Sequence, residues 1–285
     1  MSGGYERSQI IRVQGRNGQL PEWEKSRLPY YEIYYQVSGR SRVFVDHSVY
    51  GLGPGSALIL KPGRIHRLVG RMGLSWELVL VRFTEEGIKL FHRFCGREKK
   101  KEEKCIRISV PRLQRPYVEK LLETMEKEAL GEDKFAALME LCCLNQFLVS
   151  LGRCPEDQEE REQREEWECS VEKTASYLYH SCGEKIHLNQ ADSVCGMGAS
   201  YFSRKFKEAT GFGFKEYLTE VRIRRACILL LTTKDSMEKI AVACGFGDRN
   251  YFGDAFAKAM GVSPTAFRRQ KGAFCGDRES GGEAD

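Results

Sequence analysis

Residues 236–252 read Ser-Met-Glu-Lys-Ile-Ala-Val-Ala-Cys-Gly-Phe-Gly-Asp-Arg-Asn-Tyr-Phe, and they outline two short helices with a tight turn between them. Ser236, or Asp235 before it, is suited to cap the first helix, because its side-chain oxygen can accept a hydrogen bond from a free backbone N–H of the first turn. Gly245 supplies the turn, and Asp248 can cap the second helix. The stretch therefore predicts a helix-turn-helix unit, a motif that presents its second helix to the major groove of DNA.

One aromatic pattern occurs twice in the carboxy-terminal third of the chain. Tyr201-Phe202, Phe206, Gly211 and Tyr217 recur 50 residues later as Tyr251-Phe252, Phe256, Gly261 and Phe267. In each copy the two phenylalanines are four residues apart and share one face of a helix, and the glycine suits the end of that helix. Because helices this short need neighbours to pack against, the repeat predicts two equivalent helical units in one all-α domain.

The residues around this repeat closely resemble the AraC family of transcription regulators. The second unit matches through Ile240-Ala241, Gly245-Phe246, Asp248, Tyr251-Phe252, Phe256, Gly261-Val262-Ser263-Pro264 and Phe267-Arg268. The first unit and a long helix after it match through Gly211, Phe214, Tyr217-Leu218, Arg222-Ile223, Ala226 and Leu229-Leu230. The resemblance covers about 100 residues. It implies two helix-turn-helix units joined by a long helix, with recognition helices that enter successive major grooves on one face of the DNA.

The resemblance also implies which residues contact DNA. It places the recognition helices at residues 199–208 and 249–258. The outward, DNA-contacting side chains are Ser200, Ser203, Arg204 and Lys207 in the first helix and Arg249, Asn250, Gly253 and Asp254 in the second. Arg204 is suited to a guanine edge and Asn250 to adenine. Lys207 is expected to contact a phosphate, which positions the protein without reading the sequence.

Some residues depart from the family's pattern. The second recognition helix has Gly253-Asp254 where the family usually has a Ser-Arg-like pair. Asp254 can repel phosphates, accept a hydrogen bond from cytosine or pair with Lys258 one turn on, and we expect the second unit to bind DNA less strongly than the first. In the first unit, the small residue of the first helix is Ala191 or Asp192, and Gly198 replaces the usual Ser cap.

The amino-terminal half has the pattern of a β domain followed by helices. Runs rich in Tyr, Val, Ile and Leu at residues 31–37, 41–45, 56–60 and 74–83 are separated by turns with Gly and Pro, which predicts an all-β sandwich or barrel. Between residues 116 and 151 the apolar residues change to helical spacing, and we predict two helices that break near Gly131. Their apolar stripe is expected to pack on its own domain, with a dimer seam as the alternative.

The β region resembles the cupin-like ligand-binding barrel of the same family, most closely at Pro54-Gly55-Ser56 and at Pro62-Gly63 with His66 shortly after. The fold class is then α+β: a cupin-like β-barrel with two following helices, and an all-α DNA-binding domain. By resemblance the barrel holds a small-molecule effector, with Tyr34, His66, Trp76, Leu78 and Leu80 at the pocket. An apolar wall with a Trp suits a sugar stacked on the indole or a small apolar or aromatic compound. The same side chains could instead simply fill the barrel.

Two other functions are compatible with such a barrel. It could serve for dimerisation alone, or it could be a cupin enzyme fused to a DNA-binding domain. Catalytic cupins hold a metal through a His-x-His, Glu and His set, whereas residues 25–32 contain no His and His66 stands alone nearby. Since a metal site needs several convergent ligands, we expect no metal, no cofactor and no enzyme activity. The family implies a homodimer that binds double-stranded DNA and activates transcription together with RNA polymerase.

Charge divides the chain into parts. Residues 171–271 contain 16 Lys and Arg against 10 Asp and Glu, so the positive charge that suits a DNA partner lies there. Residues 155–168 are almost wholly polar and largely acidic, which predicts a solvated linker. We therefore expect an effector-binding or dimerisation domain at 1–153, a linker at 154–170, a DNA-binding domain at 171–271 and a flexible tail at 272–285.

The sequence also predicts the compartment. Its start lacks the basic region followed by an apolar stretch that marks a secretory signal, and no apolar run is long enough to span a membrane. The 11 cysteines are an odd number and form no C-x-x-C pair, which fits a reducing compartment better than a disulfide framework. We therefore expect a cytoplasmic protein without a membrane partner.

Overall fold

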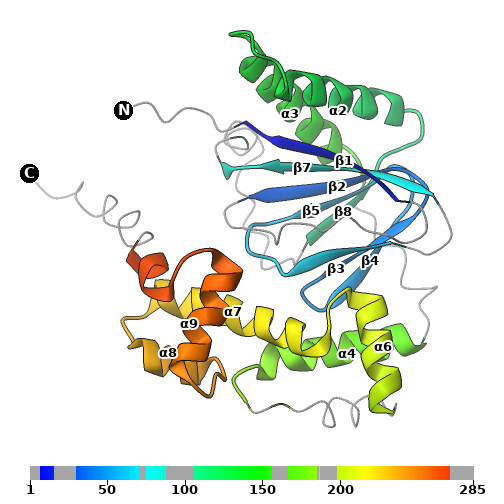
Figure 1. The fold of residues 1–285 in the computed structure, drawn as a ribbon. Helices are drawn as coiled ribbons and strands as arrows, with labels where there is room; N and C mark the ends of the chain where they lie inside the picture. The colour runs from blue at the N-terminus through cyan, green and yellow to red at the C-terminus, as the bar shows by residue number, and fades with distance from the viewer. Residues whose placement is uncertain are drawn as a thin grey trace, which may run out of the picture. The chain divides into compact units, whose positions relative to one another are not determined.

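The computed structural model describes residues 7–15, 30–70, 75–85, 87, 105–155, 166–184, 186 and 198–269. The chain divides into two compact units, residues 1–165 and 166–285, and each is described by itself. Figure 1 shows antiparallel sheets with helices packed on them in the first unit, and helices alone in the second. This combination confirms the α+β class that the sequence predicts.

The strands of the first unit form two antiparallel sheets. They are β1 (Gln9–Gly15), β2 (Tyr31–Ser38), β3 (Ser41–Val45), β4 (Ser48–Leu52), β5 (Ser56–Leu60), β6 (His66–Gly70), β7 (Trp76–Phe83) and β8 (Cys105–Ser109). One sheet has the order β1-β7-β2-β5-β8 and the other β4-β3-β6. The four predicted strands correspond to β2, β3, β5 and β7, whereas β1, β4, β6 and β8 were not predicted.

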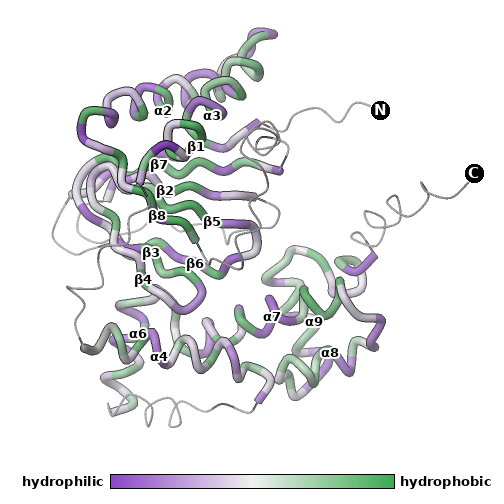
Figure 2. The backbone as a smooth tube through the Cα atoms, turned by 180° about the vertical axis from the view of Figure 1, so that it is seen from behind, coloured by the Kyte–Doolittle hydropathy of each residue, from purple (hydrophilic) through white to green (hydrophobic). Residues whose placement is uncertain are grey.

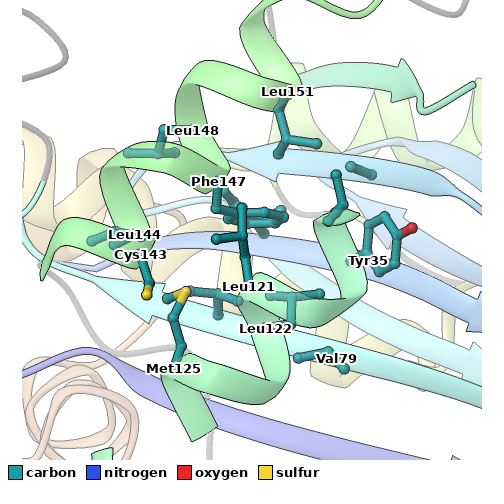
Figure 3. Close-up of a cluster of buried hydrophobic side chains, with 14 of the residues drawn as sticks. Tyr35, Val79, Leu121, Leu122, Met125, Cys143, Leu144, Phe147, Leu148 and Leu151 are labelled. Carbon is teal, nitrogen blue, oxygen red and sulfur yellow. The ribbon is translucent and has the colours of Figure 1, made fainter. Parts of the chain in front are cut away.

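The larger sheet separates two hydrophobic cores, because successive side chains of a strand point to opposite faces. The first core lies between this sheet and the helices α2 (Arg115–Ala129) and α3 (Ala136–Gly152). Figure 3 shows Leu122 and Met125 of α2 and Phe147 of α3 in one cluster with Tyr35 and Val79 of the sheet. Figure 2 shows the matching concentration of hydrophobic residues along the central strands. The helices break around Gly131, as predicted.

The second core lies between the two sheets. On β2 and β7, Tyr34, Trp76, Leu78 and Leu80 point into it, while their neighbours Tyr35 and Val79 point toward the helices. The smaller sheet contributes Val43, Val45 and Leu68. The interior of the predicted barrel is therefore lined by apolar side chains from both sheets.

The second unit contains α4 (Glu166–Ser181), α6 (Ala199–Thr210), α7 (Phe214–Thr232), α8 (Met237–Ala243) and α9 (Arg249–Met260), and residues 264–269 are also helical. The predicted long connecting helix is α7, with 19 residues. Residues 166–170, which the sequence analysis assigns to the linker, form the start of α4. Residues 187–197, which include Ala191 and Asp192 of the expected first helix, lie outside the described residues, as do the linker residues 156–165 and the tail.

The predicted repeat is visible in the packing of this unit. The rings of Phe206 and Tyr217 lie 5.7 Å apart, and those of Phe256 and Phe267, each 50 residues further on, lie 5.5 Å apart. All four side chains are buried. Since aromatic pairs at this distance stabilise a core beyond the area that they bury, α6 and α9 are held on the domain by equivalent contacts.

Candidate nucleic-acid interface

The second helix-turn-helix unit, formed by α8 and α9, has the predicted geometry. The Ser236 hydroxyl accepts a hydrogen bond from the backbone N–H of Lys239 and so caps α8. Asp248 caps α9 in the same way, at 2.9 Å from the N–H of Tyr251. Gly245 forms the turn with a φ of 81°. A side chain there would also meet the carbonyl oxygen of Cys182 at 2.5 Å, so both the conformation and the space require glycine.

Phe246 fills the space between the two helices of this unit. Its ring lies 5.2 Å from that of Phe252 and 5.9 Å from that of Tyr251. The guanidinium carbon of Arg222 on α7 lies 5.9 Å from the centre of the same ring, and Arg222 also donates to the carbonyl oxygen of Cys182 at 2.9 Å. The long helix is thereby joined to the turn, which fixes the direction in which α9 is presented.

The first recognition helix, α6, carries its predicted contact residues on one side. Ser200, Ser203, Arg204 and Lys207 follow the spacing i, i+3, i+4, i+7, which places them on one face of a helix. Ser200, Arg204 and Lys207 are exposed and Ser203 is half-buried, while Phe202 and Phe206 on the other side are buried. The helix begins at Gly198 without a side-chain cap, as the sequence implies.

An aromatic ring supports the predicted base-reading residue of α6. The guanidinium carbon of Arg204 lies 5.3 Å from the centre of the Tyr201 ring, and the tyrosine is 44% exposed. A cation over the face of a ring is attracted to it, and the contact uses none of the N–H donors of the arginine. Sequence reasoning did not predict this contact, although the spacing of three residues within one helix would allow it.

The second recognition helix, α9, exposes Arg249, Asn250 and Asp254, with Gly253 half-buried beside them. Asp254 forms no ion pair with Lys258, and no hydrogen bond joins it to any other residue within the described ranges. The carboxylate that replaces the family's usual cation is therefore a free acceptor on the same side as Asn250. Of the three roles expected for Asp254, pairing along the helix is therefore not supported by the structure.

Arg249 has a partner that the sequence analysis did not identify. Its Nη1 donates to Oε1 of Glu238, in the first turn of α8, and both side chains are more than half exposed. The backbone N–H of Glu238 lowers the pKa of its carboxyl below the ordinary value, and Arg249 and Ser236 lower it further. The pair spans 11 residues and crosses the turn, so no periodicity within one helix could have indicated it.

The predicted effector residues come together inside the barrel. Tyr34, Trp76, Leu78 and Leu80 are each at most 3% exposed and belong to one cluster. Trp76 keeps its indole N–H buried, and no acceptor for it is found in the described part of the chain. The ring of His66 lies 5.8 Å from that of Tyr34, edge to face. Four of the five residues thus belong to one buried cluster, and His66 contacts this cluster through the Tyr34 ring.

His66 is part of a buried ionic group. Its Nε2 is paired with Oε2 of Glu32, and the other oxygen of Glu32 accepts a hydrogen bond of 2.6 Å from Nε of Arg82. Glu32 and Arg82 face each other across β2 and β7. Nδ1 of His66 lies 3.0 Å from the carbonyl oxygen of Arg64. Both imidazole nitrogens therefore face acceptors, which favours the doubly protonated, charged ring.

These contacts shift the pKa values of the group in opposite directions. Burial alone lowers the pKa of His66, but the Glu32 carboxylate and the Arg64 carbonyl outweigh burial and raise the pKa above its ordinary value. Burial raises the pKa of Glu32, and the charges of His66 and Arg82 outweigh it, so that the net pKa is lowered. Burial, with the Glu32 charge, raises the pKa of Tyr34 well above its ordinary value. At neutral pH the carboxylate is thus ionised and the phenol neutral.

The sequence did not indicate the group of Glu32, Arg82 and His66, because its members lie on three different strands. The usable signal was a charged residue on the inward side of each of two apolar strands, since such residues are buried only when they are paired. In the part of the chain that the structure covers, no three His, Cys, Asp or Glu side chains gather as they would around a metal ion. None of the described helices is long and apolar enough to cross a membrane.

Known proteins resemble both units of the chain. A model of the AraC-like ligand binding domain matches residues 14–142, and a model of a helix-turn-helix domain matches residues 193–270. The HTH-type transcriptional activator RhaR of Mannheimia succiniciproducens is 26% identical over 259 residues, which are 90% of this chain and 91% of that protein. RhaR of Pectobacterium carotovorum subsp. carotovorum is 42% identical over 66 residues, 23% of either chain. The solved C-terminal domain of AraT, a response regulator from Geobacillus stearothermophilus, is 32% identical, with a TM-score of 0.35, and the match covers 35% of this chain and 84% of that one.

The two matched models follow each other in the same order as the two units, the first over the barrel and the second over α6 to α9. The match to the first relative runs along nearly the whole of both chains. With the repeat and the helix-turn-helix geometry described above, these similarities establish that the chain belongs to the AraC family of DNA-binding transcription regulators.

Proposed function

We propose that this regulator is an effector-responsive activator that reads two successive major grooves with α6 and α9. The observation that carries the proposal is the duplication of a helix that is anchored by aromatic pairs and exposes polar side chains on its other side. Two such helices on one domain suit two base-reading contacts on one face of DNA. The second candidate is a DNA-binding regulator whose amino-terminal unit only dimerises.

In this proposal Arg204 reads a base and Lys207 holds a phosphate. Arg204→Ala should then cost about 1–3 kcal/mol on the selected site and leave random DNA nearly unaffected. Lys207→Ala should weaken binding to all sequences about equally and reduce the slope of log affinity against log salt by about 0.9. Titration of both variants against a selected and a random duplex, at two salt concentrations, tests the assignment. Equal losses on both duplexes for Arg204→Ala would remove the base contact from the proposal.

We also propose that the chain is organised as the sequence implies, with domains at 1–153 and 171–271, a linker at 154–170 whose residues 166–170 form the start of α4, and a tail at 272–285. The carboxy-terminal domain should fold and bind DNA by itself. Because α4 begins at Glu166, a fragment of residues 166–271 keeps that helix whole. The fragment should show helical circular dichroism and an affinity for DNA that falls as salt rises. An unfolded fragment would place the domain limit elsewhere.

The effector is proposed to bind in the barrel, at Tyr34, His66, Trp76, Leu78 and Leu80. The apolar wall and the buried indole suit a sugar ring or a small apolar or aromatic compound, and the unpaired indole N–H offers it a hydrogen bond. A polar group on the ligand that accepts this bond would satisfy a buried donor.

A thermal-shift screen of the full chain against sugars and small aromatic compounds tests this site. A ligand at 100 times its dissociation constant stabilises the folded state by about 2.7 kcal/mol. Trp76→Phe keeps most of the ring and removes the N–H, so it should reduce the shift for a ligand that accepts from the indole. If no compound in either class shifts the unfolding temperature, the second candidate function is favoured.

The homodimer is proposed to form through the outward side of α3. Phe135, Leu138, Met139 and Val149 lie on this side and are 38–58% exposed. The charged residue within α3, Glu140, is buried, so the outward side of the helix carries no charge. Exposed apolar patches of this kind mark association surfaces. The inner side of the same helix packs on the sheet, so its apolar pattern serves both expected roles in this proposal.

Sedimentation equilibrium of a Leu138→Glu, Met139→Glu variant tests the dimer. The variant should be monomeric where the unaltered chain is a dimer. Leu113→Glu is the matched control, because Leu113 is 95% exposed but precedes α2. A variant that remains dimeric would place the interface on another surface.

The remaining parts of the proposal follow from family membership: the regulator acts in the cytoplasm, contacts RNA polymerase, needs no cofactor and catalyses no reaction. Transcription in vitro with purified RNA polymerase and a promoter that carries the selected site tests the activator role. We expect more transcript when the regulator is present. Less transcript would identify a repressor.

A further inference from the structure

The pair between Glu238 and Arg249 lies where the second unit should meet DNA. Arg249 is the first residue of α9, and the amino-terminal residues of a recognition helix are those that reach base edges. Glu238 extends from the preceding helix of the same unit. A cation at the reading end of the helix is thus held by a carboxylate of the protein itself.

The carboxylate is well placed to hold this cation. The backbone N–H of Glu238 and the Ser236 side chain lower the pKa of this carboxyl and so favour its charged form. Ser236 is in turn fixed as the cap of α8. The pair is still exposed to solvent, with side-chain exposures of 62% for Arg249 and 55% for Glu238. Exposed ion pairs are weak, so a strong competitor can replace the carboxylate.

Arg204 in the first helix-turn-helix unit shows the opposite arrangement. Its guanidinium lies over the Tyr201 ring, which leaves its charge and its N–H donors available. Arg249 shares Nη1 with Glu238, and its charge is balanced. When Arg249 contacts a phosphate, it only exchanges the Glu238 carboxylate for another anion. A guanine offers O6 and N7 to two donors at once.

We propose that Glu238 is a specificity-determining residue of the second unit, which withholds Arg249 from random DNA and releases it to a base edge that accepts two hydrogen bonds. On random DNA the pair stays closed, and Arg249 adds little to phosphate attraction. On the correct site the two bonds to the base replace the bond to Glu238. Specificity is the difference between the affinity for the correct site and the affinity for random DNA. The carboxylate improves specificity because it lowers the affinity for random DNA. This inference rests on the proposed contact between Arg249 and DNA.

Glu238→Gln tests the inference in the full chain, because it removes the charge and keeps the shape. The variant should bind random duplex DNA more tightly, and its slope of log affinity against log salt should steepen by about 0.9, which is roughly a threefold larger loss of affinity between 50 and 200 mM salt. The ratio of specific to random affinity should fall. Glu123→Gln is the matched control, because Glu123 forms an exposed pair with Lys120 on α2, in the amino-terminal compact unit. The same change of net charge there should leave the salt slope and the specificity ratio unaltered.

Arg249→Ala and the double variant Glu238→Gln, Arg249→Ala separate the possible failures. If Arg249→Ala leaves the specific affinity unchanged, the contact between Arg249 and DNA is wrong and the proposed function of this helix fails. If Arg249→Ala weakens binding but Glu238→Gln changes neither the salt slope nor the specificity ratio, the inference alone is overturned. The inference also requires that Glu238→Gln has no effect once Arg249 is absent. An equal gain in the two backgrounds would show that Glu238 repels DNA directly, and would overturn it.

Discussion

The two recognition helices share a scaffold and differ in the charge that they present. α6 carries Arg204, Lys205, Lys207 and Glu208, a net charge of +2, whereas α9 carries Arg249, Asp254 and Lys258, a net charge of +1. The scaffolds share equivalent contacts in their cores and at the ends of their helices. Each helix ends at a left-handed glycine, Gly211 with a φ of 73° and Gly261 with a φ of 74°, whose N–H bonds the carbonyl four residues back at 2.9 and 2.8 Å.

This difference separates two tasks that a helix-turn-helix unit performs. The buried side determines where the helix lies, and it is built from the same aromatic positions in both units. The exposed side determines what the helix binds, and it differs at nearly every predicted contact. The first unit has the cations that attract phosphates. The second has a paired arginine, an amide and a free carboxylate, groups that suit hydrogen bonds to bases.

The largest effect is expected from the shared scaffold. Phe206→Ala and Phe256→Ala each remove a fully buried ring, and each should cost about 3–5 kcal/mol of stability. Because the two rings have equivalent partners, Tyr217 and Phe267, the two costs should be similar. Urea unfolding of the full chain, followed by helical circular dichroism, measures both. A cost below about 1 kcal/mol for one of them would show that the two units are not equivalent.

A smaller effect is expected from the charge of α9. Asp254→Arg replaces a free carboxylate with the kind of residue that the family usually has. It should tighten binding to random DNA and steepen the salt dependence by about one phosphate contact. Glu123→Arg makes the same change of charge in the first unit and serves as the control. Weaker binding to the selected site, together with tighter binding to random DNA, would identify Asp254 as a reader of cytosine. An unchanged salt slope would show that this side of α9 does not face DNA.

The smallest effect on this comparison is expected from pH, because the titrating group lies in the barrel. The raised pKa of His66 means that its pairing stabilises the first unit below about pH 6.5 and that this contribution is lost as pH rises through the folded-state pKa. The lowered pKa of Glu32 means that its contribution is lost only as pH falls below about 4. The pair therefore stabilises most between these limits.

His66→Gln isolates this contribution, since glutamine can still donate to Glu32. The unaltered chain should unfold at a higher temperature than the variant at pH 6, and the difference should shrink at pH 9. The relative DNA affinities of the α6 and α9 variants should stay the same. A temperature difference that does not change with pH would mean that His66 is uncharged in the folded protein.

The sequence predicted those elements whose signals are local. Gly245, Asp248 and the aromatic repeat each fix a turn, a cap or a helix face within a few residues, and the structure has all three. β1 was missed because Gln-Ile-Ile-Arg-Val-Gln-Gly has no clean alternation and gains its strand conformation from pairing with β7, some 70 residues away. β4 and β6 are short and contain Gly51 and Arg67 within strands, which weakens the pattern that marks a strand.

The sequence predicted which residues of the candidate site lie on the outward side of the recognition helices, but it did not predict the contacts between side chains within the site. The exposure of Arg204, Lys207 and Asn250 agrees with their expected outward placement, although contact with DNA stays a prediction for each. The partners Glu238 and Glu32 were missed for one reason. Each acts across a turn or between strands, and such pairings depend on the folded chain rather than on spacing along it.

Selection of binding sites from a random duplex pool tests the central claim most directly, because it reports which base pairs each helix reads. The full chain should select two blocks of preferred bases, about one helical turn or 10 base pairs apart. Arg204→Ala should relax the preference in one block and Arg249→Ala the preference in the other. A single block, or two variants that relax the same base pairs, would contradict the account in which α6 and α9 read successive major grooves.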